Sequence, residues 1–412
     1  MLDKKMVPEI RFKGFNEKWK TYYFSEIIYP SGEKNINNLI LKSYSVSNKY
    51  GFINQEEQFK YGGIALAADK SRSTVVDCNT FAYNPARIDV GSIGYWDKGE
   101  KILISPMYEV FKTNKNFVND TFLVKWFKTE IFNSIVLSNQ EGGVRTCFSL
   151  QKMLSSYATF PTSVSEQQKI GQFFSNLDSI IHFQEQKIKK LQTTKQSLLD
   201  KMFAYTPGKL PEISFKGSKG ESWQFSKLNS FVTKGVDNRG FTPKYCNKGP
   251  HPIIEVASLG NIWPNYSKVV KYLSETTFNS ELRGYVQQGD ILFSTVGAIG
   301  SVSIMDNNLQ ACIAQNVIGL RAKDNFNYNF IYQLFCDEKN KKLTNSIVMS
   351  AVQPSIKVSQ LFQLDYLITL DSAEQRKIGL FLISLDSLIY SHEQKLEKLN
   401  KIKQALLEKM FC

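Results

Sequence analysis

The stretch "EQQKIGQFFSNLDSIIHFQEQKIKKLQTTKQSLLDKMF", residues 166–203, returns as "EQRKIGLFLISLDSLIYSHEQKLEKLNKIKQALLEKMF", residues 374–411. Apolar residues recur in both copies with the 3.5-residue spacing of a coiled-coil seam. The predicted packing residues are Ile170, Phe174, Leu177, Ile181, Ile188, Leu191 and Leu198 in the first copy, and Ile378, Leu382, Leu385, Ile389, Leu396, Leu399 and Leu406 in the second. We therefore expect two long helices that pack on each other as an antiparallel coiled-coil spacer.

Polar residues interrupt both seams at the same two places. Gln184 corresponds to His392, and Lys195 corresponds to Lys403. Polar seam positions lower stability but fix the register and number of partners. An S-x-x-Q pattern, which begins at Ser165 and again at 372, predicts a capping box at each helix start.

Shorter matches place these helices within a larger repeat. "PEIRFKG" at residue 8 returns as "PEISFKG" at 211, "GSIG" at 91 as "GAIG" at 297, and "NSIVLS" at 133 as "NSIVMS" at 345. The matches keep their order, which indicates a tandem duplication of about 205 residues. Between them the halves diverge, so we expect similar frames with different tasks.

Each repeat combines short β-rich runs, bounded by Gly, Pro and Asn, with helical patterns such as "NDTFLVKWFKTEIFNSIVLS" from Asn119. The expected fold class is α+β, with two mixed α/β domains in tandem, each followed by a long helix. The expected boundaries are 1–162 for the first globular domain, 163–203 for the central helix, 204–210 for a Pro/Gly linker, 211–371 for the second globular domain and 372–412 for the C-terminal helix.

The composition favours an anionic partner. Lys and Arg number 51 against 38 Asp and Glu, a net charge of +13, and such an excess attracts polyanions. Six cysteines without a C-x-x-C pair and three histidines predict neither a zinc site nor a disulfide framework. Neither a signal peptide nor a membrane span is predicted, so we expect a cytoplasmic protein.

The motifs do not assemble an active site. "NPAR" at Asn84 lacks the second proline and the aromatic residue of an amino-methyltransferase box, and "VGAIGS" at Val296 is no phosphate-binding loop. His251 lies between two prolines and is interpreted as a loop residue. A recognition module is favoured over an enzyme, and no metal site is expected.

For a DNA ligand, the arginines are informative because there are only eight of them. Lysine neutralises phosphate as a point charge, whereas arginine contacts guanine through two hydrogen bonds. The candidate DNA-binding residues lie in divergent stretches with small neighbours: Lys70, Ser71, Arg72, Arg87 and Arg145 in the first repeat, and Arg239, Lys244, Gln353, Ser355 and Lys357 in the second.

Together these residues carry a family resemblance. Two divergent globular parts, each followed by a helix that opens with "EQQKIGQFFSNLD" or "EQRKIGLFLISLD" and ends with "LLDKMF" or "LLEKMF", resemble the specificity subunit of a type I restriction-modification system. "GDILFSTVGAIGSVSI" and "NSIVMSAVQPSIKVSQL" in the second half are also similar to that family.

The resemblance implies a non-catalytic chain whose two target-recognition domains each read one half of a split, asymmetric site in double-stranded DNA. It implies helices that set the spacing and dock two methyltransferase subunits, which methylate adenine at N6, with restriction and translocase subunits completing the complex. No cofactor is expected on this chain; S-adenosylmethionine, ATP and Mg are expected on the partner subunits. A methylation system without nuclease and a coiled-coil scaffold without DNA specificity are the alternatives.

Overall fold

The computed structural model describes residues 6–48, 51–58, 69–139, 147–215, 223–238, 243–282, 284–308, 310–349 and 352–412. The chain forms two compact units. The first unit comprises Met1–Phe183 and Glu397–Cys412, and the second comprises Gln184–Leu396. The two long helices therefore contribute to both units.

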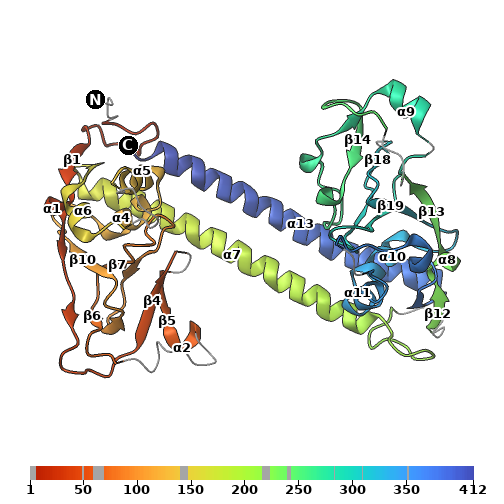
Figure 1. Ribbon diagram of the computed structural model, residues 1–412, viewed down its shortest axis with the longest axis horizontal. Coiled ribbons are helices and arrows are strands. Elements are labelled where there is room, and N and C mark those ends of the chain that lie inside the picture. Colours follow the sequence, from red (N-terminus) through yellow and green to blue (C-terminus); the bar gives the residue numbers. More distant parts are fainter. Residues whose placement is uncertain are drawn as a thin grey trace. The chain divides into compact units, whose positions relative to one another are not determined.

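The first unit contains three β-sheets. Its strands are β1 (Lys20–Tyr23), β2 (Ile28–Pro30), β3 (Glu33–Lys34), β4 (Ser43–Ser47), β5 (Gly51–Asn54), β6 (Thr74–Val76), β7 (Thr80–Tyr83), β8 (Ile93–Trp96), β9 (Ile102–Ile104), β10 (Glu109–Thr113) and β11 (Tyr157–Phe160). They are ordered β1-β11, β2-β10-β7-β8 and β3-β6-β9-β4-β5. The helices are α1 (Phe24–Ile27), α2 (Gln55–Gln58), α4 (Asp120–Trp126), α5 (Glu130–Ser138), α6 (Leu150–Ser155) and the start of α7 (Val164–Met202). Figure 1 shows β4, β5 and β6 at the end of this unit away from α4, α5 and α6.

The second unit repeats two of these sheets and replaces the third. Its strands are β12 (Gln224–Lys227), β13 (Val232–Asp237), β14 (His251–Ile254), β15 (Tyr272–Leu273), β16 (Ile291–Ser294), β17 (Val302–Ile304), β18 (Cys312–Ile313), β19 (Val317–Ala322) and β20 (Asp365–Ile368). The orders β12-β20 and β13-β19-β16-β17 match those of the first unit, whereas β15-β14-β18 has three strands in place of five. The divergent sequence therefore builds the divergent sheet.

The helices of the second unit follow the same scheme. They are α8 (Leu228–Phe231), η1 (Val256–Ser258), η2 (Tyr266–Lys268), α9 (Glu275–Glu281), α10 (Tyr328–Cys336), α11 (Glu338–Asn345), α12 (Val358–Leu361) and α13 (Ser372–Lys409). Figure 1 shows α10 and α11 at one end of this unit and α9 with β14 at the other. The pair α10 and α11 corresponds to α4 and α5. The helical pattern that starts at Asn119 forms two helices and not one continuous helix, because Thr129 caps a new helix by accepting a hydrogen bond from the Phe132 backbone N–H.

Each unit's core contains the end of the long helix that belongs to the other repeat. In the first unit, Phe411 lies 5.4 Å from Phe122, measured between ring centroids. In the second unit, Phe203 stacks on Phe330 at 5.3 Å. Burial of each such side chain stabilises its core by about 1.5–3 kcal/mol.

Each long helix starts with a close contact to its own globular part. A Cβ on Gly171 would lie 2.7 Å from the Phe122 backbone nitrogen, and a Cβ on Gly379 would lie 2.7 Å from the Phe330 nitrogen. Only glycine permits this approach. The predicted capping boxes are wrong, because Ser165 lies inside α7 and Ser372 is the first residue of α13. Ser163 and Asp371 accept the first-turn N–H groups instead.

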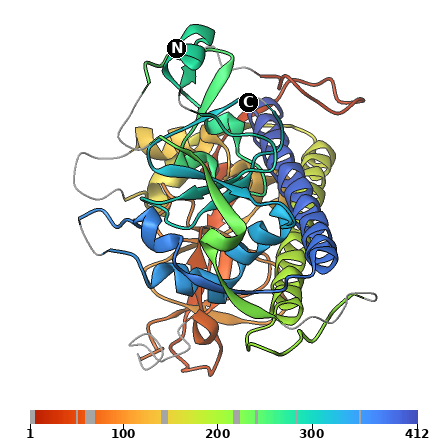
Figure 2. The ribbon, with the colours of Figure 1, turned by 90° about the vertical axis from the view of Figure 1, so that its right-hand side faces the viewer.

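Within each unit α7 and α13 lie side by side (Figure 2). In the second unit, Gln184 Nε2 lies 2.7 Å from His392 Nδ1 and donates to the His392 carbonyl oxygen at 2.8 Å. Farther along the pair, Lys195 Nζ donates to Asp386 Oδ1 at 2.6 Å. As the residue number increases along α7, the number of the contacting residue in α13 decreases, so the helices are antiparallel, as expected. The residues that interrupt the predicted seams are therefore held in polar contacts.

An equivalent polar cluster lies in the first unit. Asp178 accepts from Lys125 at 2.7 Å and from Lys403 at 2.6 Å. Burial acts to raise the pKa of Asp178, but these two lysines outweigh burial and the pKa is lowered. The same position in the second unit is Asp386, which accepts from Gln333 and Lys195. The half-buried carboxylates of Asp178 and Asp386 are thus each paired within their own unit.

The residues predicted to pack along the helices are buried or half-buried. The buried residues are Ile170, Phe174, Leu177, Ile181, Ile188, Ile378, Leu382 and Ile389, and the half-buried ones are Leu191, Leu198, Leu385, Leu396, Leu399 and Leu406. Near the helix ends Leu199 and Leu407 are more buried than their predicted neighbours, because they join the globular cores.

Candidate functional site

In the first unit, three candidate DNA-binding residues form a turn that leads into β6. Asp69 accepts hydrogen bonds from the Ser71 backbone N–H at 2.9 Å and from the Ser71 hydroxyl at 2.6 Å. These bonds lower the pKa of Asp69. Arg72 is exposed, and Lys70 and Ser71 are half-buried. The hydroxyl of Ser71 therefore has an intramolecular partner, and Arg72 has the most accessible side chain of the three.

Arg87 is exposed in the connection between β7 and β8. The side-chain oxygen of Asn84 accepts from the Ala86 N–H at 3.0 Å, and the Asn84 carbonyl accepts from the Arg87 N–H at 3.0 Å. Asn84 thus shapes a turn, which is a common role for asparagine. The "NPAR" stretch presents Arg87 on this turn.

The turn formed by residues 105–107 lies near both of these loops. A cavity of about 130 Å³ is lined by Lys70 together with Ser105 and Pro106. The next residue, Met107, has its Sδ atom 3.9 Å from Asn84 Nδ2. The 105–107 turn therefore shares a cavity with the loop that carries Arg72 and contacts the loop that carries Arg87.

In the second unit, Gln353, Ser355 and Lys357 lie along residues 352–357, which lead into α12. The Met349 N–H donates to the Ser355 carbonyl at 2.9 Å, and the Ile356 N–H donates to the Thr295 carbonyl at 2.9 Å. Gln353 and Lys357 are exposed, and Ser355 is half-buried. Ser355 and Ile356 are thus held beside the glycine-rich turn 297–300.

Lys244 belongs to a different part of the second unit. Its side chain is exposed, and its N–H donates to Glu281 of α9 at 3.3 Å. It precedes the bridge between Cys246 and Tyr272, beside β15. The remaining candidates, Arg145 and Arg239, lie outside the described residues.

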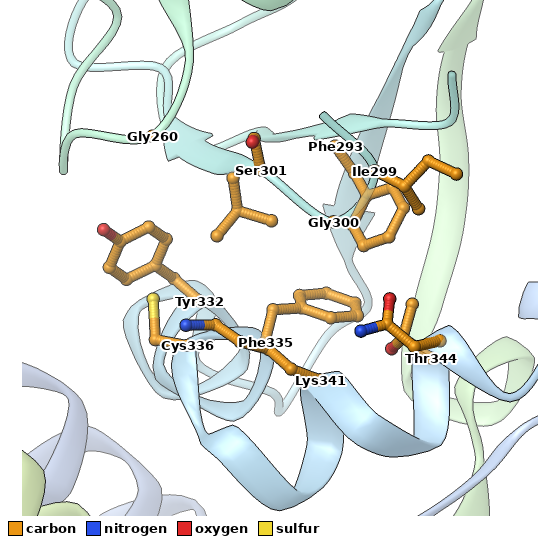
Figure 3. Close-up of a pocket in the computed structure, with 12 residues that line it drawn as sticks. Gly260, Phe293, Ile299, Gly300, Ser301, Tyr332, Phe335, Cys336, Lys341 and Thr344 are labelled. Atoms are coloured by element: carbon orange, nitrogen blue, oxygen red, sulfur yellow. The ribbon is translucent and has the colours of Figure 1, made fainter. Parts of the chain in front are cut away.

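A cavity of about 350 Å³ lies between α10, α11 and the turn 299–302 (Figure 3). The Tyr332 ring, Cys336 and Lys341 line it. Burial raises the pKa of both the Tyr332 hydroxyl and the Cys336 thiol. Nucleophilic catalysis requires the thiolate, so this cavity does not activate Cys336.

Two further findings concern the part of the chain that the structure describes. Its His, Cys, Asp and Glu residues form no group of three or more that would hold a metal ion. None of its helices carries an apolar stretch long enough to cross a membrane.

The chain is similar to type I restriction-modification proteins along its length. The family described as the type I restriction modification DNA specificity domain matches residues 220–401. The MjaVIII specificity subunit of a type I restriction enzyme from Methanocaldococcus jannaschii is 23% identical over 95% of this chain and 91% of that protein.

Solved structures share the fold. The S subunit of the type I system from M. genitalium superposes with a TM-score of 0.64 at 12% identity, over 99% of both chains. A chain from a structural study of complex assembly and conformational transition of the type I R-M system superposes with a TM-score of 0.51 at 14% identity, over 95% of this chain and 97% of that one.

The matched domain covers the second repeat, and the first repeat has the same sheet orders and the same helix start. Residues 220–401 therefore form a type I restriction modification DNA specificity domain, and nearly the whole chain is similar to a specificity (S) subunit of a type I restriction enzyme.

Proposed function

We propose that each globular unit reads one half of a split, asymmetric site in double-stranded DNA. The observation that carries this proposal is the contrast between repeated and divergent structure. Both units share two sheets and the contacts at the helix start, whereas the third sheet has five strands in one unit and three in the other. Two different surfaces on one frame suit two different half-sites.

Phosphate contacts come mainly from lysine, and base contacts come from exposed residues such as Arg72, Arg87 and Gln353. Their loops are held by backbone hydrogen bonds, so little conformational entropy is lost on binding. Arg145, Arg239, Lys244, Ser355 and Lys357, with Lys70 and Ser71, complete the proposed set.

The helices act as the spacer between half-sites. α7 has 39 residues and α13 has 38, so each spans about 57 Å at 1.5 Å per residue. Half-sites one DNA turn apart are separated by about 34–36 Å. The Gln184–His392 contact and the cluster at Asp386 resist sliding of one helix along the other.

Two methyltransferase subunits dock on the helices. Within the first unit, α7 exposes Ile180 and Phe183, and within the second unit α13 exposes Leu380 and Leu388. Ile180 and Leu388 occupy equivalent positions of the repeat, as two copies of one partner require. The methyltransferases bind S-adenosylmethionine and flip the target adenine out of the duplex. The restriction and translocase subunits use ATP and Mg, and the complex works in the cytoplasm.

Sequencing of methylated adenines tests this function. The chain is co-expressed with its methyltransferase subunit, and the control strain lacks only this chain. We expect a new split motif, methylated on both strands at one spacing. Gln353→Ala should relax one half of the motif and Arg87→Ala the other. Absence of new methylation from an assembled complex would refute the proposal and favour a scaffold.

A further inference from the structure

The connection between β3 and β4 in the first unit exposes three apolar side chains. Ile36 is 76% exposed, Leu39 is 44% exposed, and Ile40 is fully exposed. Packing within the unit does not cover these three side chains. Clustered exposed apolar residues mark an interaction surface.

A buried asparagine holds this loop in one conformation. Asn35 is 1% exposed, and its side-chain oxygen accepts from the Leu39 N–H at 2.8 Å. Its side-chain nitrogen donates to the Leu39 carbonyl at 3.2 Å and to the Lys70 carbonyl at 3.3 Å. Asn38 takes a positive φ of 47°, which asparagine tolerates. The isoleucines are therefore presented on a fixed loop.

The same bonds place the loop beside a basic turn. Asn35 donates to Lys70, and the Asn35 N–H donates to the Ser73 carbonyl at 2.9 Å. The two segments, 33–42 and 69–72, carry four basic side chains against two carboxylates. Lys34, Lys42 and Arg72 are all exposed. Exposed apolar side chains surrounded by basic ones complement a ligand that is a polyanion and also has apolar surface. Duplex DNA is such a ligand, because its phosphates are anionic and its bases offer apolar surface.

We propose that Ile36 and Ile40 make apolar contact with the bases of the first half-site. This inference rests on the proposed function, and it adds specificity-determining residues that carry neither charge nor hydrogen bonds. Apolar side chains discriminate bases by packing on the thymine methyl group or by wedging between base steps. The lysines and Arg72 hold the backbone while the isoleucines contact the base pairs.

The second unit presents a comparable side chain. Val352 is fully exposed beside Gln353, three residues before Ser355, whose carbonyl accepts from the Met349 N–H at 2.9 Å. It contacts the bases of the second half-site in the same way. The two units therefore use different loops for one kind of contact.

The test uses the complete complex with its methyltransferase subunits and a duplex that carries the methylated motif. Binding of wild type, Ile36→Ala with Ile40→Ala, and Val352→Ala is measured over a range of salt concentrations. Ile213→Ala, at an exposed isoleucine outside these loops, is the matched control. Duplexes with either half-site scrambled assign each loss.

We expect the double isoleucine variant to bind the complete site about tenfold more weakly, with its salt dependence unchanged. Scrambling the first half-site should then reduce the affinity of this variant less than it reduces the affinity of wild type. Val352→Ala should show the same pattern for the second half-site, and Ile213→Ala should bind as wild type does.

Substituted duplexes distinguish the two kinds of apolar contact. If a thymine methyl group is contacted, replacing thymine by uracil in the first half-site weakens DNA binding by wild type and leaves binding by the double isoleucine variant unchanged. If an isoleucine instead inserts between base steps, 2-aminopurine fluorescence rises when wild type binds and does not rise when the double variant binds. Unchanged affinity in a folded double variant, or an equal loss on non-specific DNA, would overturn the inference. If wild type itself ignores sequence, the proposed function fails instead.

Discussion

Two equivalent glutamates have opposite environments, and their replacement should have opposite effects. Glu166 accepts two hydrogen bonds from the Arg11 guanidinium, at 2.6 and 2.8 Å. Glu374 is 1% exposed, and neither of its carboxylate oxygens has a hydrogen-bond partner among the described residues. Ser214 stands in "PEISFKG" where Arg11 stands in "PEIRFKG". The second unit thus keeps the glutamate of this ion pair but has Ser214 in place of the arginine.

Methionine at either position keeps the side-chain length and removes the carboxylate. Glu166→Met leaves Arg11, itself 12% exposed, without its partner, at a cost of about 2–4 kcal/mol. Glu374→Met removes two unsatisfied oxygens, which regains about 1–2 kcal/mol. It also loses about 0.3–1 kcal/mol, because an anion in the first turn interacts favourably with the helix dipole. The net gain is about 1 kcal/mol.

The pH dependence follows from the direction of the pKa shift. Burial and then the neighbouring Asp371 raise the pKa of Glu374, and Lys377 opposes them. The folded state therefore holds the proton more tightly than the unfolded state, so this contribution to stability is fully present below the unfolded pKa of about 4.3. It is lost as pH rises through the folded pKa. The gain from Glu374→Met should be largest above that pKa and should shrink on acidification.

Calorimetry at pH 8 and pH 5 measures both variants, and hydrogen exchange assigns each change to a unit. For units of about 200 residues, 1 kcal/mol shifts the Tm by about 2–4 °C. We expect Glu374→Met to raise the Tm of the second unit by that amount and Glu166→Met to lower the Tm of the first unit by about 4–16 °C. Destabilisation of similar size by both variants would refute the reasoning.

Three further predictions concern the helices. Gly171→Ala and Gly379→Ala should each destabilise their unit by about 2 kcal/mol in calorimetry, although alanine favours helices, because the new Cβ meets backbone 2.7 Å away; a raised Tm would contradict this. Asp386→Ala should cost about 2–4 kcal/mol in denaturant unfolding, since it leaves a half-buried ammonium group without its acceptor, and a loss below 0.5 kcal/mol would count against it. Gln184→Leu should cost about 1–2 kcal/mol and its combination with His392→Leu should recover stability; a double-mutant cycle without coupling would exclude the paired role.

The repeat in the sequence was sufficient to predict the architecture. Trp19 and Trp223, which follow the repeated "PEIRFKG" and "PEISFKG" stretches, are both fully buried in equivalent cores. The polar positions Gln184 and His392 meet as one pair. These features were predictable because a twofold repeat places equivalent residues in equivalent surroundings.

The loops were less predictable, because their conformations depend on contacts between distant residues. Asn35 connects the 36–40 loop to Lys70, 35 residues away, and sequence spacing does not reveal such a bond. The helix caps were wrong for a related reason. The S-x-x-Q pattern is satisfied at Ser165, but Ser163 lies at the actual start of the helix.

The return of α13 to the first unit has a consequence for synthesis of the protein. Leu407, Met410 and Phe411 complete a core whose other members lie between Trp19 and Phe174. At about 5–20 residues per second, a ribosome needs about 12–46 s to translate the roughly 230 residues between Phe174 and Leu407. During that time the nascent first unit exposes an unfilled apolar groove, and its final packing waits until Leu407, Met410 and Phe411 have been synthesised. Chaperone dependence should therefore be greater for the first unit than for the second. The last buried core residue of the second unit, Leu382, follows its last strand, β20, closely in the sequence.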